Sequence, residues 1–117
     1  MDAEAGPAQV RRAVEAVKRA TGALINLLKS PDEVVRAGAA DALRGLDPPP
    51  VVDLIAALIK ARDTGFRVEI IRVLGGLGEG YRVHATLALA QLWQDGDPAI
   101  RQAIVEAVLG MGPASLD

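Results

Sequence analysis

The stretch SPDEVVRAGAADALRGL, residues 30–46, decides the fold because its pattern returns twice further along the chain. DTGFRVEIIRVLGGLG covers residues 63–78, and DPAIRQAIVEAVLGMG covers residues 97–112. In each copy an arginine follows an aspartate by four residues, and the three arginines are 31 and 34 residues apart. Apolar residues stand one position before each arginine and three, six and ten positions after it. This spacing follows one face of an α-helix, so the sequence predicts the same helix three times.

A second apolar pattern lies upstream of each copy, as LINLLK (residues 24–29), IAALIK (55–60) and LALAQLWQ (87–94). Aligned with the same spacings of 31 and 34, these segments give three columns: Leu24, Ile55 and Leu89; Leu27, Leu58 and Leu92; and Leu28, Ile59 and Trp93. We expect Trp93, like the rest of its column, to lie in the core or between repeats. Two helical patterns in register predict a helix–turn–helix unit repeated three times, which is an α-solenoid.

The N-terminal segment raises a choice between one helix and two. Apolar residues keep helical phase from Pro7 to Lys29, although Gly22 lies inside this span. A glycine in a helix interior costs about 1 kcal/mol. A helix end at Thr21 and Gly22 would make the segment a terminal half-repeat, but it would leave no room for a connecting turn. We therefore predict one long helix, with Gly22 as the place for any bend.

The pattern Asp-x-x-[Val/Phe/Ile]-Arg, followed by small and aliphatic residues and then Leu-Gly or Met-Gly, resembles the HEAT repeat. It is similar in particular to the short form found in phycobilisome-lyase-like proteins. The resemblance covers residues 7–112 and implies an all-α, armadillo-like fold: a right-handed α-α superhelix of three antiparallel helix pairs. The approximate repeats are 7–46, 48–78 and 79–112, within a single domain that spans residues 1–117. The 34-residue third unit departs from the family pattern.

The resemblance also implies roles for two columns of charged residues. The aspartates would cap the second helix of each pair, and the arginines would bridge neighbouring repeats. The aspartates are Asp32, Asp63 and Asp97, and the arginines are Arg36, Arg67 and Arg101. Because these residues recur with the repeat and do not converge on one place, we expect a structural role for them, not a row of anion-binding groups.

Composition limits the classes of function. The chain has 13 basic and 15 acidic residues, and this net charge of -2 argues against nucleic acid as the main ligand, because such binding depends on phosphate neutralisation. The chain has no cysteine, which excludes disulfides, thiolate zinc sites and cysteine nucleophiles. The N-terminal residues MDAEAGPAQV do not look like a signal peptide, and no apolar run approaches the roughly 18 residues of a membrane span. We therefore expect a cytoplasmic protein without membrane attachment.

Two features invite a catalytic interpretation, and neither predicts an enzyme. GGLGEG, at residues 75–80, has glycines at the spacing of a phosphate-binding loop, but it follows a helix and lacks the subsequent Lys-Ser or Lys-Thr. We expect Gly78 to end that helix in a left-handed conformation. His84 is the one histidine, so a paired-histidine metal site is excluded. We predict no catalytic residues, no cofactor and no metal; the alternative that the resemblance permits is a phycobilin-lyase-like or lyase-associated protein.

The one concentration of basic residues lies in the first helix. Its members are Arg11, Arg12, Lys18 and Arg19, with Glu15 placed to pair with Arg11 and Arg19. Nucleic acid or an anionic membrane surface could bind there, but no aromatic residue is interleaved to stack on bases or to anchor in lipid. The pattern favours the solvated face of a helix.

The leading functional hypothesis is a non-catalytic scaffold module that binds another protein. Solenoid repeats present an extended surface built from their second helices. Residues two, five and eight positions after each repeat arginine fall on the side away from the first helices, where small residues flank opposite charges. The candidate partner-binding residues are Asp41, Arg44, Glu69, Arg72 and Glu106, together with Tyr81 in the longest connection. An open alternative is that these charges only pair with each other as solvated neighbours.

The ends of the chain also favour self-association. Val10, Val14 and Val17 extend the first helix beyond the shorter helices that it packs against. The C-terminal pair ends in AIVEAVLGMGPASLD, which carries little charge. Because a terminal repeat has no neighbour to cover it, these surfaces predict a homodimer through a terminal repeat or through the first helix.

Overall fold

The computed structural model describes residues 6–95 and 97–110, and all regular elements in these ranges are helical. In chain order they are α1 (Pro7–Leu27), α2 (Glu33–Gly45), α3 (Val51–Lys60), α4 (Thr64–Gly75), the 3-10 helix η2 (Glu79–Tyr81), α5 (Arg82–Leu92), the 3-10 helix η3 (Trp93–Asp95) and α6 (Pro98–Gly110). The prediction of an all-α fold is confirmed. The predicted helix end at Met111 and Gly112 lies outside the described residues.

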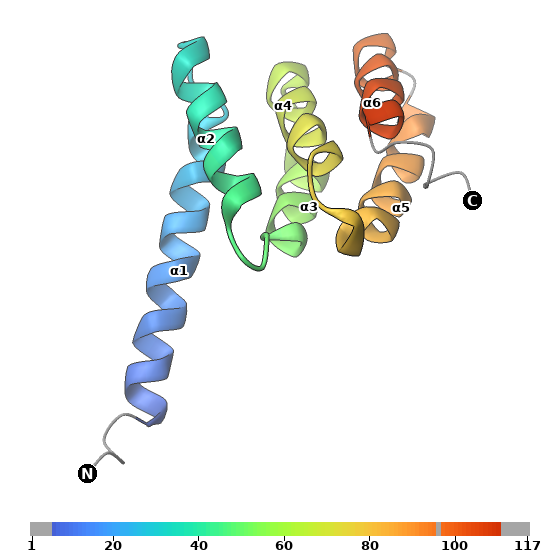
Figure 1. Ribbon diagram of the computed structural model, residues 1–117. Helices are drawn as coiled ribbons and strands as arrows, with labels where there is room; N and C mark the ends of the chain where they lie inside the picture. Colours follow the sequence, from blue (N-terminus) through green and yellow to red (C-terminus); the bar gives the residue numbers. More distant parts are fainter. Residues whose placement is uncertain (1–5, 96, 111–117) are drawn as a thin grey trace.

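The α-helices lie in two layers (Figure 1). One layer consists of α2, α4 and α6, and the other consists of α1, α3 and α5. Within each successive pair, such as α1 and α2, the two helices also pack against each other. The central element is α4, which packs against its layer neighbours α2 and α6 and also against α3 and α5. The site residues predicted on the second helices therefore stand on one layer of the fold.

The first helix is continuous from Pro7 to Leu27, as predicted. Pro7 opens it at a position where a missing N–H group leaves no intrahelical hydrogen bond unmade. Gly22 is tolerated because its neighbours Thr21 and Ile25 are buried, and tertiary packing supplies more helix stability than intrinsic propensity does. The helix ends two residues before the predicted Lys29, whose N–H group bonds the Asn26 carbonyl at 3.0 Å in a tight turn.

An aspartate marks the start of each helix in the α2, α4 and α6 layer. The Asp32 carboxylate accepts a hydrogen bond from the Val34 N–H group at 2.9 Å. Asp63 accepts one from Phe66 at 2.8 Å, and Asp97 accepts one from the N–H group of Ala99 at 2.9 Å. Such caps satisfy backbone donors that have no intrahelical partner, and each contributes typically about 1 kcal/mol.

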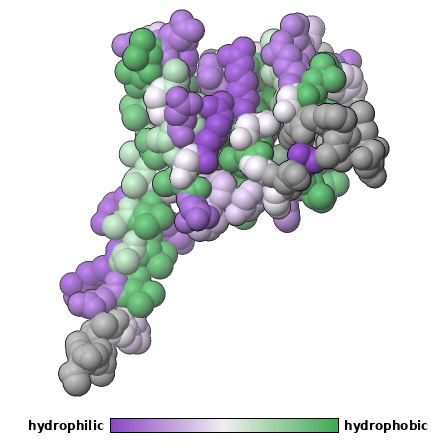
Figure 2. All heavy atoms as spheres, in the orientation of Figure 1, coloured by the Kyte–Doolittle hydropathy of each residue, from purple (hydrophilic) through white to green (hydrophobic). Residues whose placement is uncertain are grey.

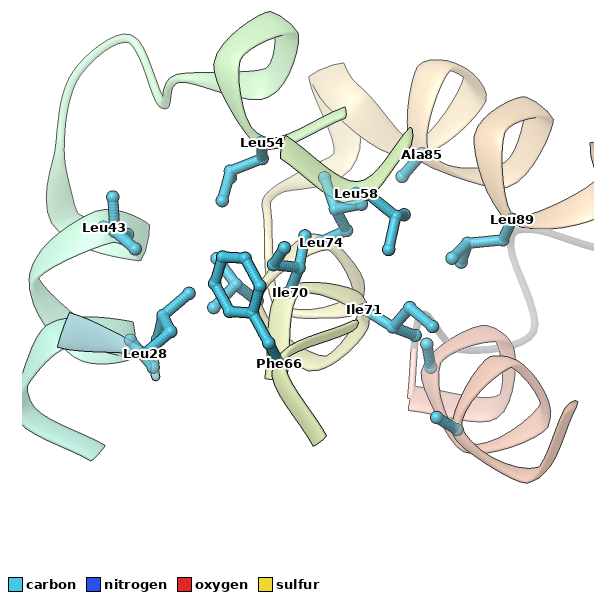
Figure 3. Packing of buried hydrophobic residues seen from close by; sticks show 14 of the residues in the cluster. Leu28, Leu43, Leu54, Leu58, Phe66, Ile70, Ile71, Leu74, Ala85 and Leu89 are labelled. Carbon is cyan, nitrogen blue, oxygen red and sulfur yellow. The ribbon is translucent and has the colours of Figure 1, made fainter. Parts of the chain in front are cut away.

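The core fills the space between the two layers (Figure 3). Its largest fully buried side chains are all aliphatic: Leu28, Leu43, Leu54, Leu58, Ile70, Ile71, Leu74, Leu89, Ile100 and Val73. The ring of Phe66 lies beside Ile70 in the middle of this cluster. The second-helix column three positions after each arginine, Ala39, Ile70 and Ile104, is buried as predicted.

The alignment of the first helices is wrong. Ile59 and Trp93 were placed in a core column, yet Ile59 lies on the surface and Trp93 is 42% exposed. The buried equivalents are Leu28, Leu58 and Leu89, which are 30 and 31 residues apart. Leu58 therefore matches Leu28 and not Leu27, a shift of one residue that the adjacent leucines allow. In the third unit the shift is three residues, close to one helical turn, so the apolar pattern of LALAQLW fits either alignment.

The three extra residues of the third unit form η3, directly after α5, and are not part of a first helix. Trp93 opens η3 at the edge of the molecule. Its ring lies under the guanidinium group of Arg101, 5.2 Å from the ring centroid. Arg101 Nε also donates a hydrogen bond to the Trp93 carbonyl at 2.9 Å. Trp93 thus anchors the turn before α6, and it does not fill the core.

The glycine-rich segment after α4 also differs from its prediction. The helix ends at Gly75, and Gly78 does not adopt a left-handed conformation. The reason for the glycines is close packing on both sides: a Cβ atom at Gly75 would lie 2.7 Å from the Cβ atom of Ala107 in α6. A Cβ atom at Gly76 would collide with the Arg44 side chain of α2. Gly75 therefore allows α6 to approach the end of α4, and Gly76 leaves room for the Arg44 side chain.

Candidate protein-binding surface

The candidate residues Asp41 and Arg44 lie on α2, Glu69 and Arg72 lie on α4, and Glu106 lies on α6. Figure 2 shows the layer that carries them, with hydrophilic residues gathered above all over α4. The structure therefore places the five charges predicted on second helices in a single layer. Tyr81 is separate from them, since it ends η2 and precedes α5, where it is half-buried.

Each candidate charge has a polar partner on its own helix. Arg44 Nη1 lies 2.9 Å from Asp41 Oδ1. Arg72 Nη1 lies 3.4 Å from Glu69 Oε2, and Gln102 Nε2 donates to Glu106 Oε2 at 3.3 Å. This is the pairing between neighbours that the sequence left open as an alternative. Within each ion pair, however, one side chain is more exposed than the other. Asp41 is 79% exposed against 33% for Arg44, and Arg72 is 56% exposed against 19% for Glu69.

Glu69 has a second role between helices. Its Oε2 atom lies 3.5 Å from Arg36 Nε, and its side chain is only 19% exposed. Arg36 in turn donates a hydrogen bond from Nη1 to the Ser30 carbonyl at 2.6 Å. Glu69 therefore links α2 to α4 and holds Arg72, and Arg72 is the member of this group that faces solvent.

The small residues do not all line the open face. Gly38 is exposed, as predicted, but Ala103 is buried, and the prediction that it flanks the charges is wrong. The cause is the close packing of α6 on α4, where Gly75 leaves room for Ala107. This contact turns the alanines of α6 toward α4.

The repeat arginines differ in their contacts. Arg36 bridges two units through Glu69, whereas Arg101 contacts Trp93 within its own unit. Arg67 is half-buried and lines the groove between α3 and α5, beside Ile55 and Leu92. The repeat pattern predicts one role for all three arginines, but each of them has different neighbours in the structure.

A link between the second and third units was missed. The Thr64 hydroxyl group donates a hydrogen bond to Asp97 Oδ2 at 3.1 Å, while Asp97 Oδ1 caps α6. One carboxylate therefore fixes the starts of α4 and α6 together. The available signal was a threonine directly after the capping Asp63, a position from which a side chain can reach the neighbouring helix start.

The α1, α3 and α5 layer carries exposed apolar residues that sequence reasoning also missed. Val52 and Ile59 are exposed on α3, and Val83 and Leu87 are exposed on α5. Their spacings of seven and four residues place each pair on one side of its helix, away from the buried Leu58 and Leu89 columns. Large apolar side chains gathered on a surface are typical of contact sites for other proteins.

The described residues also bear on metal binding and membrane insertion. No group of three or more His, Cys, Asp or Glu side chains is gathered there as metal ligands. In the same part of the chain, no helix has both the length and the apolar character to cross a membrane. His84 is exposed on the first turn of α5.

Comparison with known proteins adds no relative: no family model, no curated protein and no solved structure matches this chain.

Proposed function

We propose that this chain is a non-catalytic protein-binding module, built as a short HEAT-like α-solenoid, that binds a polypeptide on the surface of α2, α4 and α6. The repeated design supports this proposal. Each of these three helices starts at a capping aspartate, and each packs against the next in one layer. A layer of parallel helices built in this way offers an extended surface to a partner.

The observation that carries the proposal is the exposure of Asp41 and Arg72. They stand on neighbouring helices and have opposite charges, and each is the more exposed member of its ion pair. Exposed ion pairs contribute about 0–1 kcal/mol, so a partner can replace either pairing at small cost. The matching polypeptide brings a basic group to Asp41 and a carboxylate to Arg72.

The surroundings of Asp41 suit close approach. Ala37, Gly38 and Ala42 are exposed on the same helix, and none has a side chain longer than a methyl group. A polypeptide can therefore reach the backbone of α2 without displacing large side chains. Longer surface side chains would lose rotamer freedom on binding, which small residues avoid.

The apolar layer provides a competing surface for the same kind of function. Ile59 of α3 lines a groove with Ala88 and Leu92 of α5. A partner that docks there would depend on apolar burial and would be insensitive to the charges at Asp41 and Arg72. The two surfaces can therefore be separated by charge substitutions.

The experiment is affinity capture with a charge-neutral swap, Asp41→Lys with Arg72→Glu, read by quantitative mass spectrometry. The control swap, Asp53→Lys with Arg62→Glu, keeps the same net charge and changes exposed residues of α3 and of the turn after it, outside α2 and α4. We expect all three proteins to melt at similar temperatures and the first swap alone to lose the captured partner. If both swapped proteins capture the partner equally, the binding site does not lie on α2 and α4, and the apolar layer becomes the candidate. Loss of the same partner from an Ile59→Ser variant would then place the site in the groove between α3 and α5.

A further inference from the structure

The N-terminal part of α1 projects from the body of the molecule. With 21 residues, α1 is about 32 Å long, whereas the 13 residues of α2 span about 20 Å. Figure 1 shows the resulting projection beyond the ends of the other helices. Every residue from Pro7 to Ala20 is exposed. We call residues 7–20 the arm.

One side of the arm continues an interface that already exists in the molecule. Val10, Val14 and Val17 are 58%, 47% and 60% exposed and follow helical phase into Thr21 and the buried Ile25 and Leu28. That buried part of α1 packs against α2 and α3. In Figure 2 the hydrophobic residues of the arm gather along one edge and the hydrophilic residues along the other. The same apolar stripe therefore runs from the core onto an uncovered helix.

The composition of this stripe determines what can cover it. Ala13 lies between Val10 and Val14, and Ala20 follows Val17, so the stripe carries small as well as large side chains. The charged residues of the arm point away from these positions: Arg11, Arg12, Glu15, Lys18 and Arg19. Valines recur at residues 10 and 17, and alanines at 13 and 20, which is a seven-residue repeat of the kind that pairs helices.

We propose that the arm binds the arm of a second copy of this chain, with the two helices antiparallel. In one antiparallel register Val10 of one arm faces Ala20 of the other and Val17 faces Ala13, so a large side chain meets a small one at each of these places and the helices can approach closely. The pair is two-fold symmetric, so the apolar stripe of each arm is covered by the same stripe of the other copy. This inference is independent of the surface on α2, α4 and α6.

The charges of the arm set its salt dependence. Four basic residues and one acidic residue give each arm a net charge of +3. Two arms therefore repel each other, and this repulsion is screened over about 8 Å at physiological ionic strength. Association of two arms becomes stronger as salt is added. An anionic ligand such as DNA or a charged lipid would show the opposite trend.

The size of the seam sets the affinity. An arm of 14 residues is about 21 Å long, so two arms bury less than the roughly 1,600 Å² of a standard stable interface. We expect a reversible dimer with a dissociation constant of the order of micromolar to millimolar. In this register the two-fold axis passes beside Glu15, one position from Val14, so two acidic groups introduced at Val14 lie close to each other across the seam.

The test is sedimentation velocity of the full chain over a range of concentrations, at low and at high sodium chloride. We expect the average mass to rise from that of a monomer to that of a dimer as the protein concentration increases. In high salt this rise should occur at lower protein concentrations. Val14→Asp should remain monomeric with an unchanged melting temperature, because Val14 is exposed in the single chain. Ala8→Asp, which adds the same charge outside the valine and alanine stripe, should dimerise like the unsubstituted chain.

Three outcomes would overturn the proposal. The first is a monomer at every concentration and salt level. The second is a dimer that survives Val14→Asp, which would place the contact elsewhere. The third is a monomer that binds vesicles of equal parts phosphatidylserine and phosphatidylcholine, and this binding would assign the arm to an anionic surface.

Discussion

At the scale of single residues, glycine has opposite consequences at two places in this chain. Gly22 lies in the interior of α1, and no atom lies within 4 Å of the position that a Cβ atom would take. Gly75 ends α4, where a Cβ atom would lie 2.7 Å from the Ala107 Cβ atom and 3.0 Å from its Cα atom. The backbone of α6 cannot move away from Gly75 without disturbing the main contact of α4.

We therefore predict opposite signs for Gly22→Ala and Gly75→Ala. Gly22→Ala should stabilise by about 0.5–1 kcal/mol, because alanine restricts the unfolded chain and favours helix. Gly75→Ala should destabilise by about 1–3 kcal/mol, because the added methyl group overpacks the contact with α6. Urea denaturation of the two variants measures both changes. Stabilisation by Gly75→Ala would show that α4 and α6 are further apart than described.

At the scale of elements, substitutions at two adjacent residues of α3 distinguish the predicted alignment of the first helices from the observed one. Leu58 is fully buried between the layers, whereas Ile59 next to it lies on the surface. Leu58→Ala should destabilise by about 2–5 kcal/mol, and Ile59→Ala should change the free energy of unfolding by less than about 0.5 kcal/mol. Thermal unfolding of both variants provides the measurement. Comparable losses from the two would restore the alignment in which Ile59 and Trp93 share a core column.

A second prediction at this scale concerns Asp97, at the start of α6. Asp97 both caps α6 and accepts a hydrogen bond from Thr64, whereas the Asp32 carboxylate caps α2. Asp97→Ala should therefore destabilise more than the typical loss of about 1 kcal/mol for a cap. Asp32→Ala serves as the control that removes the cap alone. A double-mutant cycle with Thr64→Val isolates the link, and a coupling energy near zero would contradict it.

The helices and their starts could be predicted from the sequence because local patterns determine them. The capping aspartates and the long apolar period of α1 are local signals, and the structure agrees with them. The alignment of α5 could not be fixed, because a shift of three residues keeps apolar residues in phase. The burial of Ala103 and the close packing at Gly75 depend on how α6 meets α4, and this contact has no signal within either helix.

The candidate site divides in the same way. The pairs Asp41–Arg44 and Glu69–Arg72 follow from helical spacing, so their positions on one layer could be predicted. The link from Glu69 to Arg36 could not, because it joins helices whose relative placement depends on the whole core. The exposed apolar residues of α3 and α5 were missed because the alignment error placed Ile59 inside.

At the scale of the whole molecule, the two layers present different chemistry to a partner. Both layers expose aliphatic side chains, such as Val34 and Leu109 on the α2, α4 and α6 layer and Ile59 on the other, but the exposed charge pairs of α2 and α4 are confined to the first of these layers. The uncovered stripe of the arm belongs to the second layer. The two proposals are compatible, because the proposed partner lies on the α2, α4 and α6 layer and the proposed contact between copies lies on the arm.

Amide hydrogen exchange of the full chain, free and bound to its captured partner, tests the proposed function most directly. Binding slows exchange where it covers a helix or suppresses its local opening. The predicted result is slower exchange on binding in residues 37–45 of α2 and 68–75 of α4, with little change in α3 and α5. Slower exchange confined to α3 and α5 would contradict the account and place the partner on the apolar layer.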